Sequence, residues 1–129
     1  MDFGVLFVSP YSQDAHSLAG MLDEISGDLI YVRSLKAAAR KLETVNFQVV
    51  LTEAKLPDGS WLDALRLTRP FGIELVVTDA WADARFWAEA INRGAYDFLA
   101  QPFQTTEARR VLASAASRRL YLRAEAAVS

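Results

Sequence analysis

The sequence contains no cysteine and only one histidine among its 129 residues. The absence of cysteine excludes disulfide bonds, thiolate nucleophiles and zinc sites built from thiolates. It is compatible with a reducing compartment such as the cytosol, where disulfides are rare. The single histidine, His16, has no neighbours in the sequence that suggest a catalytic triad or a metal cluster. We expect it to lie on the surface of the first helix.

The sequence also lacks a large charge excess and a long apolar run. Its 14 Lys and Arg residues against 16 Asp and Glu residues give a formal net charge of −2, which argues against binding nucleic acid through bulk charge. No stretch approaches the roughly 20 apolar residues that span a bilayer. The first residues include Asp2 and no basic segment, unlike a signal peptide. We therefore expect a cytoplasmic domain that contacts neither nucleic acid nor membrane directly.

Apolar residues are abundant, at 52% of the chain, which is enough to fill the core of one domain. Five short apolar runs lack the alternation of a half-exposed strand, so they predict strands covered on both faces. Segments with apolar residues three and four apart lie between the runs and predict helices. The alternation predicts an α/β fold with a doubly wound parallel sheet. The runs are residues 5–8, 29–32, 47–51, 73–77 and 96–99.

Local signals indicate where several predicted helices begin. Ser34, Ser60 and Asp83 are suited to cap the second, third and fourth helices, because their side chains accept hydrogen bonds from free backbone N–H groups. The fifth helical pattern is longer than a domain of this kind needs. We therefore expect one domain over residues 1–120, with residues 121–129 as an extension of the last helix or the start of a linker.

A small set of residues, most of them polar, follows the predicted strands at their carboxyl ends. In an open parallel sheet, ligands bind at this edge, near the switch in strand order. These residues therefore form the candidate site, and we expect them to surround one shallow pocket. They are Ser9 and Pro10 after the first strand, Glu53 and Lys55 at the third, Thr78 at the fourth and Gln101 after the fifth.

Four segments resemble motifs of response-regulator receiver domains, in the same order and on the matching strands. VLFVSPYS resembles the first-strand motif, LTEAKLPDGS the third, VVTDA the fourth, and GAYDFLAQPF the signature that closes the fold. The resemblance covers nearly the whole chain. It implies a flavodoxin-like fold with five parallel strands in the order 2-1-3-4-5 and five helices. It also implies a role in two-component signal transduction, where receivers take part in phosphorelays.

The residues that this family uses for phosphoryl transfer are replaced. The resemblance places the two acidic metal ligands at Ser9 and Pro10, the phosphoacceptor aspartate at Glu53 and the lysine at Gln101. A hydroxyl, a proline and an amide do not supply the charges that hold Mg²⁺ and stabilise the transferred group. Glu53 is one methylene longer than aspartate and is misplaced for the same geometry. We interpret the chain as a degenerate pseudo-receiver, with no catalytic residue, metal or cofactor.

Thr78 and Phe98 match the hydroxyl and aromatic switch positions of the family. In an activated receiver these two residues would respond to the group at position 53, so the role of Glu53 matters. Glu53 is either a leftover surface carboxylate, which we favour, or a stand-in for an aspartyl phosphate. Lys55 or Gln101 would be its local partner. The main hypothesis is signalling by phosphorylation-independent protein–protein interaction. The alternatives are a phosphoacceptor with a non-standard site and a small-ligand sensor that uses the vacated pocket.

Phe86 and Trp87 are adjacent on the predicted fourth helix, about 100° apart, so both cannot point into the core. We expect one ring to be partly exposed at a contact with a protein partner or a second copy of the chain. The family commonly forms homodimers through the fourth helix, fifth strand and fifth helix, and an attached or cognate output domain is implied as well. Arginines of the last helix are further candidate contacts, namely Arg109, Arg110, Arg118 and Arg119.

Overall fold

The computed structural model describes residues 2–81 and 83–128. Its main sheet contains five strands in the order β2-β1-β3-β6-β7, and every neighbouring pair is parallel. This order confirms the fold class and the 2-1-3-4-5 topology predicted from the sequence. The strands are β1 (Phe3–Val8), β2 (Gly27–Val32), β3 (Val49–Glu53), β6 (Glu74–Asp79) and β7 (Asp97–Ala100).

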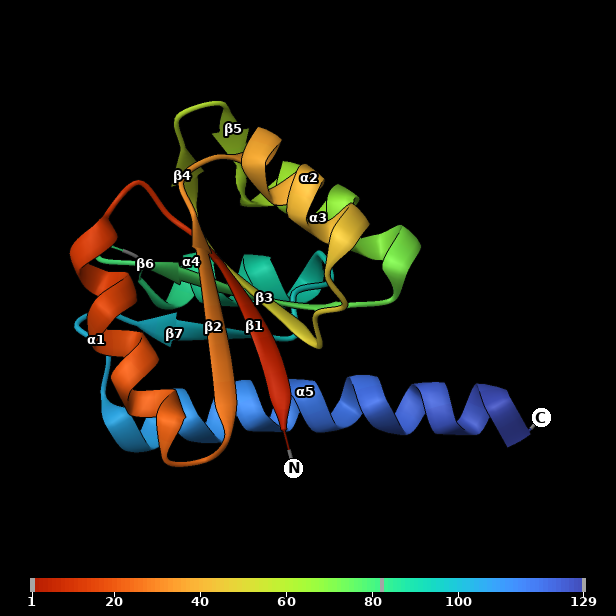
Figure 1. Cartoon of the computed structure of the whole chain (residues 1–129). Helices are drawn as coiled ribbons and strands as arrows, with labels where there is room; N and C mark the ends of the chain where they lie inside the picture. Colours follow the sequence, from red (N-terminus) through yellow and green to blue (C-terminus); the bar gives the residue numbers. More distant parts are fainter. Residues whose placement is uncertain (1, 82, 129) are drawn as a thin grey trace.

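Helices cover both faces of the sheet. α1 and α5 pack on one face, and α2, α3 and α4 pack on the other. Figure 1 shows α5 running below the sheet and α2 and α3 above it. The helices are α1 (Ser12–Asp23), α2 (Leu35–Thr44), α3 (Trp61–Thr68), α4 (Ala84–Asn92) and α5 (Thr105–Val128), and a 3₁₀ turn, η1 (Arg69–Phe71), follows α3.

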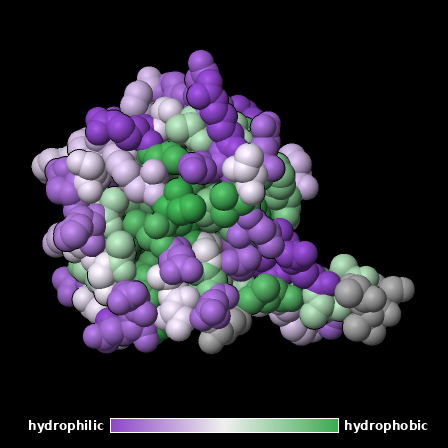
Figure 2. Space-filling view, viewed as in Figure 1, coloured by the Kyte–Doolittle hydropathy of each residue, from purple (hydrophilic) through white to green (hydrophobic). Residues whose placement is uncertain are grey.

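Two apolar cores result, one on each face of the sheet. Phe7 and Leu51 belong to the core under α1 and α5, whereas Leu6 and Val50 belong to the core under α2, α3 and α4. The central strands therefore carry apolar residues at successive positions, which explains the missing alternation in their sequences. β2 lies at the edge of the sheet, and Figure 2 shows apolar side chains gathered on the face where it lies.

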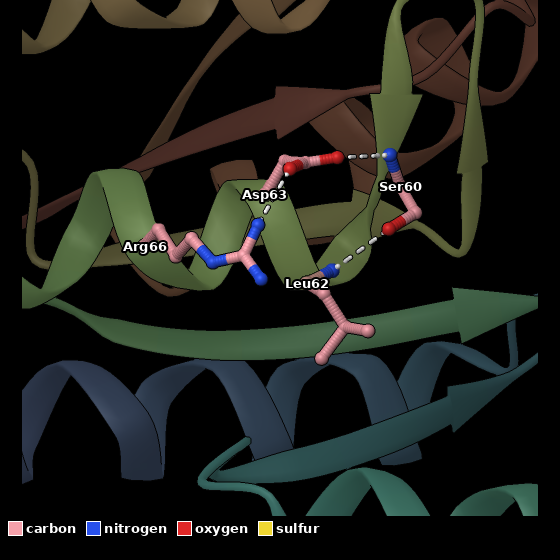
Figure 3. Close-up of polar contacts among 4 residues, drawn as sticks. All are labelled: Ser60, Leu62, Asp63 and Arg66. Carbon is pink, nitrogen blue, oxygen red and sulfur yellow. Dashed lines mark hydrogen bonds and ion pairs between the residues drawn. The ribbon is translucent and has the colours of Figure 1, made fainter.

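The predicted helix caps are confirmed. Ser34, Ser60 and Asp83 each accept a hydrogen bond from a backbone N–H in the first turn of the helix that follows. At α3 the capping is reciprocal, because Ser60 accepts from Leu62 while the carboxylate of Asp63 accepts from the backbone N–H of Ser60 (Figure 3). These contacts fix the start of α3 directly beside the carboxyl end of β3.

A small antiparallel ribbon before α3 was not predicted from the sequence. It consists of β4 (Lys55–Leu56) and β5 (Gly59–Ser60). Asp58, in the turn between them, accepts hydrogen bonds from the backbone N–H groups of Leu35 at 2.9 Å and Lys36 at 3.1 Å. Asp58 therefore caps α2 from a distant loop, and these backbone hydrogen bonds lower the pKa of its carboxyl group.

α5 has 24 residues and extends beyond the sheet as a projecting arm (Figures 1 and 2). Tyr121 and Leu122 on the arm are 63% and 43% exposed. The helix continues through Val128, and residue 129 lies outside the described part of the chain. The boundary expected near residue 120 stays a prediction, since it falls within a continuous helix. No helix in the described ranges is both long and apolar enough to cross a membrane.

Candidate functional site

A groove of about 750 Å³ lies at the carboxyl edge of the sheet. Glu53, Lys55 and Gln101 line it, as expected for residues that follow β3 and β7. Ser9 and Thr78 are fully buried and are not among its lining residues. The rest of the lining is largely aromatic and acidic, and includes Tyr11, Trp61, Asp79, Trp81, Asp83 and Phe86.

Glu53 is at one end of a short hydrogen-bonded chain. The side-chain amide of Gln101 donates to Oε1 of Glu53 at 2.7 Å and to Oγ1 of Thr78 at 3.1 Å. The hydroxyl of Thr78 in turn donates to the backbone carbonyl of Leu99 at 2.7 Å. The chain connects the ends of β3, β6 and β7 through uncharged donors.

The expectation that Glu53 is a surface carboxylate is wrong. Only 5% of the residue is exposed, because the groove floor and the ends of the strands enclose it. Its hydrogen-bond partner is Gln101, the second of the two partners considered from the sequence. Lys55 is exposed and takes part in none of the ion pairs found among residues 2–81 and 83–128.

Burial raises the pKa of Glu53 to about 7. The hydrogen bond from Gln101 opposes this shift, because it favours the charged carboxylate. The charges of Asp79 and Asp14 raise the pKa further, and a hydrogen bond with Ser9 lowers it. Near neutral pH the carboxyl group is therefore divided between its acid and its carboxylate forms.

The residues at this edge do not fit the Mg²⁺ ion that receiver chemistry uses. The side-chain oxygen of Ser9 accepts a hydrogen bond from the backbone N–H of Tyr11 at 3.0 Å, and Pro10 has no side-chain donor atom. Magnesium prefers carboxylate and water oxygens in an octahedral arrangement. Within the described ranges, no group of three or more histidine or acidic residues is placed to hold a metal ion.

Phe98, at the position that the family resemblance gives to the switch aromatic, connects the site to α4. Its ring is largely buried and packs against Phe86 with the ring centroids 5.9 Å apart, and against Trp87 at 6.5 Å. Phe86 also contacts Trp61, with the centroids 6.1 Å apart. Phe86 is half-buried, whereas Trp87 is 49% exposed. One of the two adjacent rings is thus partly exposed, as the helical spacing predicts.

The arginines of α5 do not all face α4. Arg109 donates to the backbone carbonyl of Met21 at 2.6 Å and pairs with Glu24 at 3.0 Å, so it is bound to the α1 side of the domain. Arg118 pairs with Glu74 of β6 at 3.3 Å. Arg119 is half-buried and Arg110 is exposed. The proposed arginine contacts with another chain stay a prediction, and two of the four arginines already have partners within this one.

Known structures share this architecture across nearly the whole chain. A signal receiver domain from Vibrio parahaemolyticus has a TM-score of 0.84 at 21% identity, over 94% of this chain and 95% of that domain. The chain has the receiver fold. The beryllofluoride-activated NtrC4 receiver domain dimer has a TM-score of 0.82 at 22% identity, over 90% of this chain and 98% of that one. No protein-family model matches the chain.

The sequence comparison also agrees with a receiver-fold domain. The swarming motility regulation protein RssB of Serratia marcescens is 30% identical over 105 residues, which cover 80% of this chain and 48% of the regulator. The chain therefore spans about half the length of this relative. Together with the structural matches, this similarity confirms the resemblance to response-regulator receiver domains.

Sequence reasoning missed several residues that shape the site. Asp14 acts on Glu53 although it belongs to the first turn of α1, and Tyr11 lines the groove from the loop after β1. Both positions follow a predicted strand within a few residues, which is a signal that could have placed them at the carboxyl edge. The distant cap of α2 by Asp58 has no comparable local signal.

Proposed function

We propose that this receiver-fold domain acts in two-component-type signal transduction as a pseudo-receiver, through phosphorylation-independent protein–protein interaction and without enzymatic activity. The observation that carries the proposal is the pair of Glu53 and Gln101. They occupy the positions where the family resemblance expects the phosphoacceptor aspartate and the lysine. Gln101 is uncharged, and burial keeps a large fraction of Glu53 protonated near neutral pH.

Phosphoryl transfer depends on positioned charge more than on covalent chemistry supplied by the protein. Receiver chemistry uses an ionised nucleophile, a magnesium ion and a cation beside the transferred group. Here Glu53, at the nucleophile position, is partly protonated, and the side chains at this edge do not fit Mg²⁺. The position expected to hold a cation holds the neutral amide of Gln101. A phosphoacceptor with a non-standard site is therefore less well supported than an interaction domain.

The surface best suited to a protein partner surrounds α4. Trp87 is 49% exposed and Ile91 is 39% exposed on this helix, and Trp87 packs against the switch residue Phe98. Exposed aromatic side chains are common anchors of protein interfaces. The partner we propose is a second copy of the chain or an attached or cognate output domain. One solved relative is described as a receiver domain dimer.

The proposal is tested by measuring self-association before and after incubation with acetyl phosphate and Mg²⁺. Analytical ultracentrifugation gives the dissociation constant for each sample. We expect the same constant in both samples, because no covalent charge is added to the site. A change of about tenfold or more, about 1.4 kcal/mol, that depends on both reagents and disappears in Glu53→Gln would contradict phosphorylation independence.

Small-ligand sensing is a second candidate, favoured by the size and lining of the groove. Its volume of about 750 Å³ and its aromatic side chains resemble those of small-molecule sites. Native mass spectrometry of the purified chain tests this candidate. A bound molecule that is lost in Trp61→Ala would support this candidate. If the chain, purified from cells grown in several media, shows only the mass of the protein without a ligand, the result would count against it.

A further inference from the structure

Glu53 is an acidic residue buried without a cation. It is 5% exposed, and the neutral amide of Gln101 donates a hydrogen bond to it at 2.7 Å. A carboxylate taken out of water without a positive partner favours its neutral form. The geometry alone thus predicts a group that changes charge under mild conditions, and the proposed interaction function does not use this property.

The two protonation states make different demands on the surrounding residues. The carboxylate accepts hydrogen bonds only, whereas the acid also has an O–H that needs an acceptor. The Gln101 amide nitrogen uses its two N–H groups to donate to Glu53 at 2.7 Å and to Thr78 at 3.1 Å. A charged acceptor strengthens the first of these bonds, so the balance between them shifts with the charge on Glu53.

The hydrogen bonds of Gln101 and Thr78 are connected to the exposed surface of α4 through β7. Thr78 donates to the carbonyl of Leu99, the residue that follows Phe98 in β7. The Phe98 ring contacts both Phe86 and the half-exposed Trp87 on α4. A change at Glu53 can therefore reach α4 through residues that are in direct contact.

We propose that protonation of Glu53 is a switch that controls the packing of Phe98 against α4, so that a proton replaces the phosphoryl group as the signal at this site. The inference rests on the proposed function, because it names the regulation of the same interaction domain. Loss of the proton adds a negative charge at the position where receivers acquire one by phosphorylation. Higher pH therefore favours the charged state of the switch.

The charged groups around Glu53 raise its pKa toward neutrality, as the proposed switch requires. Asp79 at the end of β6 and Asp14 in α1 repel the carboxylate. Lys55 on β4 and Asp83 before α4 also line the groove, and Lys55 makes no ion pair with Glu53 among the described residues. Burial and acidic neighbours together raise the pKa of Glu53 from 4.5 to about 7. This corresponds to proton binding about 300-fold tighter than for an exposed glutamate.

The test follows tryptophan emission as pH rises from about 5.5 to about 8.5, in a Trp81→Phe background. This substitution removes the 92% exposed tryptophan and leaves Trp61 and Trp87, which contact Phe86 and Phe98. We expect a single transition near pH 7. Glu53→Gln should abolish it. Gln101→Lys should move it down by about 1–3 pH units, because a cation favours the carboxylate.

His16→Gln is the matched control, because it removes the only histidine of the chain, which is exposed on α1. The transition should persist in this variant. Carboxyl ¹³C NMR of Glu53 supplies an independent measurement of its titration. The proposal is overturned if this carboxyl group titrates below about pH 5.5, or if it titrates near neutrality while Trp87 and the amides of α4 do not respond. Neither result depends on whether acetyl phosphate modifies the chain, so failure of the switch and failure of the proposed function are distinguishable.

Discussion

A single nitrogen atom of Gln101 donates to both Glu53 and Thr78, at 2.7 Å and 3.1 Å. The amide therefore holds the ends of β3 and β6 together beside the end of β7 without using charge. A lysine at this position would form an ion pair with Glu53 and keep it ionised. The amide instead permits the acid form, so the proposed loss of phosphoryl transfer and the proposed response of the site to pH both depend on this contact.

The first prediction concerns stability and pH. The folded-state pKa of Glu53 is raised from 4.5 to about 7, so the folded chain binds a proton that the unfolded chain releases between these values. The stabilisation from this proton is fully present below pH 4.5 and is lost as pH rises through about 7. Glu53→Gln has no such loss. Its free energy of unfolding should rise relative to wild type by about 2 kcal/mol between about pH 5 and about pH 8.

Urea unfolding at both pH values measures this difference. Glu43→Gln is a matched control, because Glu43 is exposed on α2. A difference between wild type and Glu53→Gln that stays constant with pH would show that Glu53 titrates normally.

The second prediction concerns Gln101. Gln101→Ala removes the donor to Glu53 and Thr78, and both acceptors lie in a buried environment. We expect the free energy of unfolding to fall by about 1–2 kcal/mol near pH 8, where Glu53 is ionised. The loss should be smaller in the Glu53→Gln background. Gln13→Ala, at an exposed position of α1, should have little effect. Equal effects of the two alanine substitutions would mean that the Gln101 contact contributes nothing measurable.

The third prediction concerns the distant cap of α2. Asp58→Ala removes both hydrogen bonds to the start of this helix and should destabilise the fold by about 1 kcal/mol. The pKa of Asp58 is lowered from 3.8, so its contribution is present above this value and is lost as pH falls further. Thermal unfolding at neutral pH and at acid pH measures the effect, and the variant and wild type should converge in acid. A difference in stability between the variant and wild type that widens in acid would rule out the cap.

The fourth prediction separates the two aromatic residues of α4. Trp87→Ala should weaken self-association or partner binding by about 2 kcal/mol or more, with a small effect on stability, because half of this ring is exposed. Phe86→Ala should instead lower stability by about 2 kcal/mol or more, since its ring packs against Trp61 and Phe98. Sedimentation and urea unfolding of both variants test the distinction. Unchanged sedimentation in Trp87→Ala, in a wild type that associates, would remove Trp87 from the interface.

Local sequence patterns predicted the features that depend on residues close together in the chain or on the regular geometry of a parallel sheet. The buried strands, the caps at Ser34 and Ser60 and the convergence of polar residues at one edge follow from periodicity, capping and the geometry of parallel sheets. The burial of Glu53 could not be predicted in this way. It depends on how the groove floor, Gln101 and the ends of three strands close around the carboxyl group. Asp58 illustrates the same limit, because it caps a helix 23 residues earlier in the chain.

Intact mass spectrometry after incubation with acetyl phosphate and Mg²⁺ tests the central claim most directly. Wild type should be compared with a variant that restores the site through Ser9→Asp, Pro10→Asp, Glu53→Asp and Gln101→Lys, and with a working receiver in the same reaction. We expect the mass of wild type to stay unchanged while the working receiver gains one phosphoryl group, and the restored variant should gain one as well if it folds. A phosphoryl adduct on wild type that maps to Glu53 or Ser9 would contradict the account.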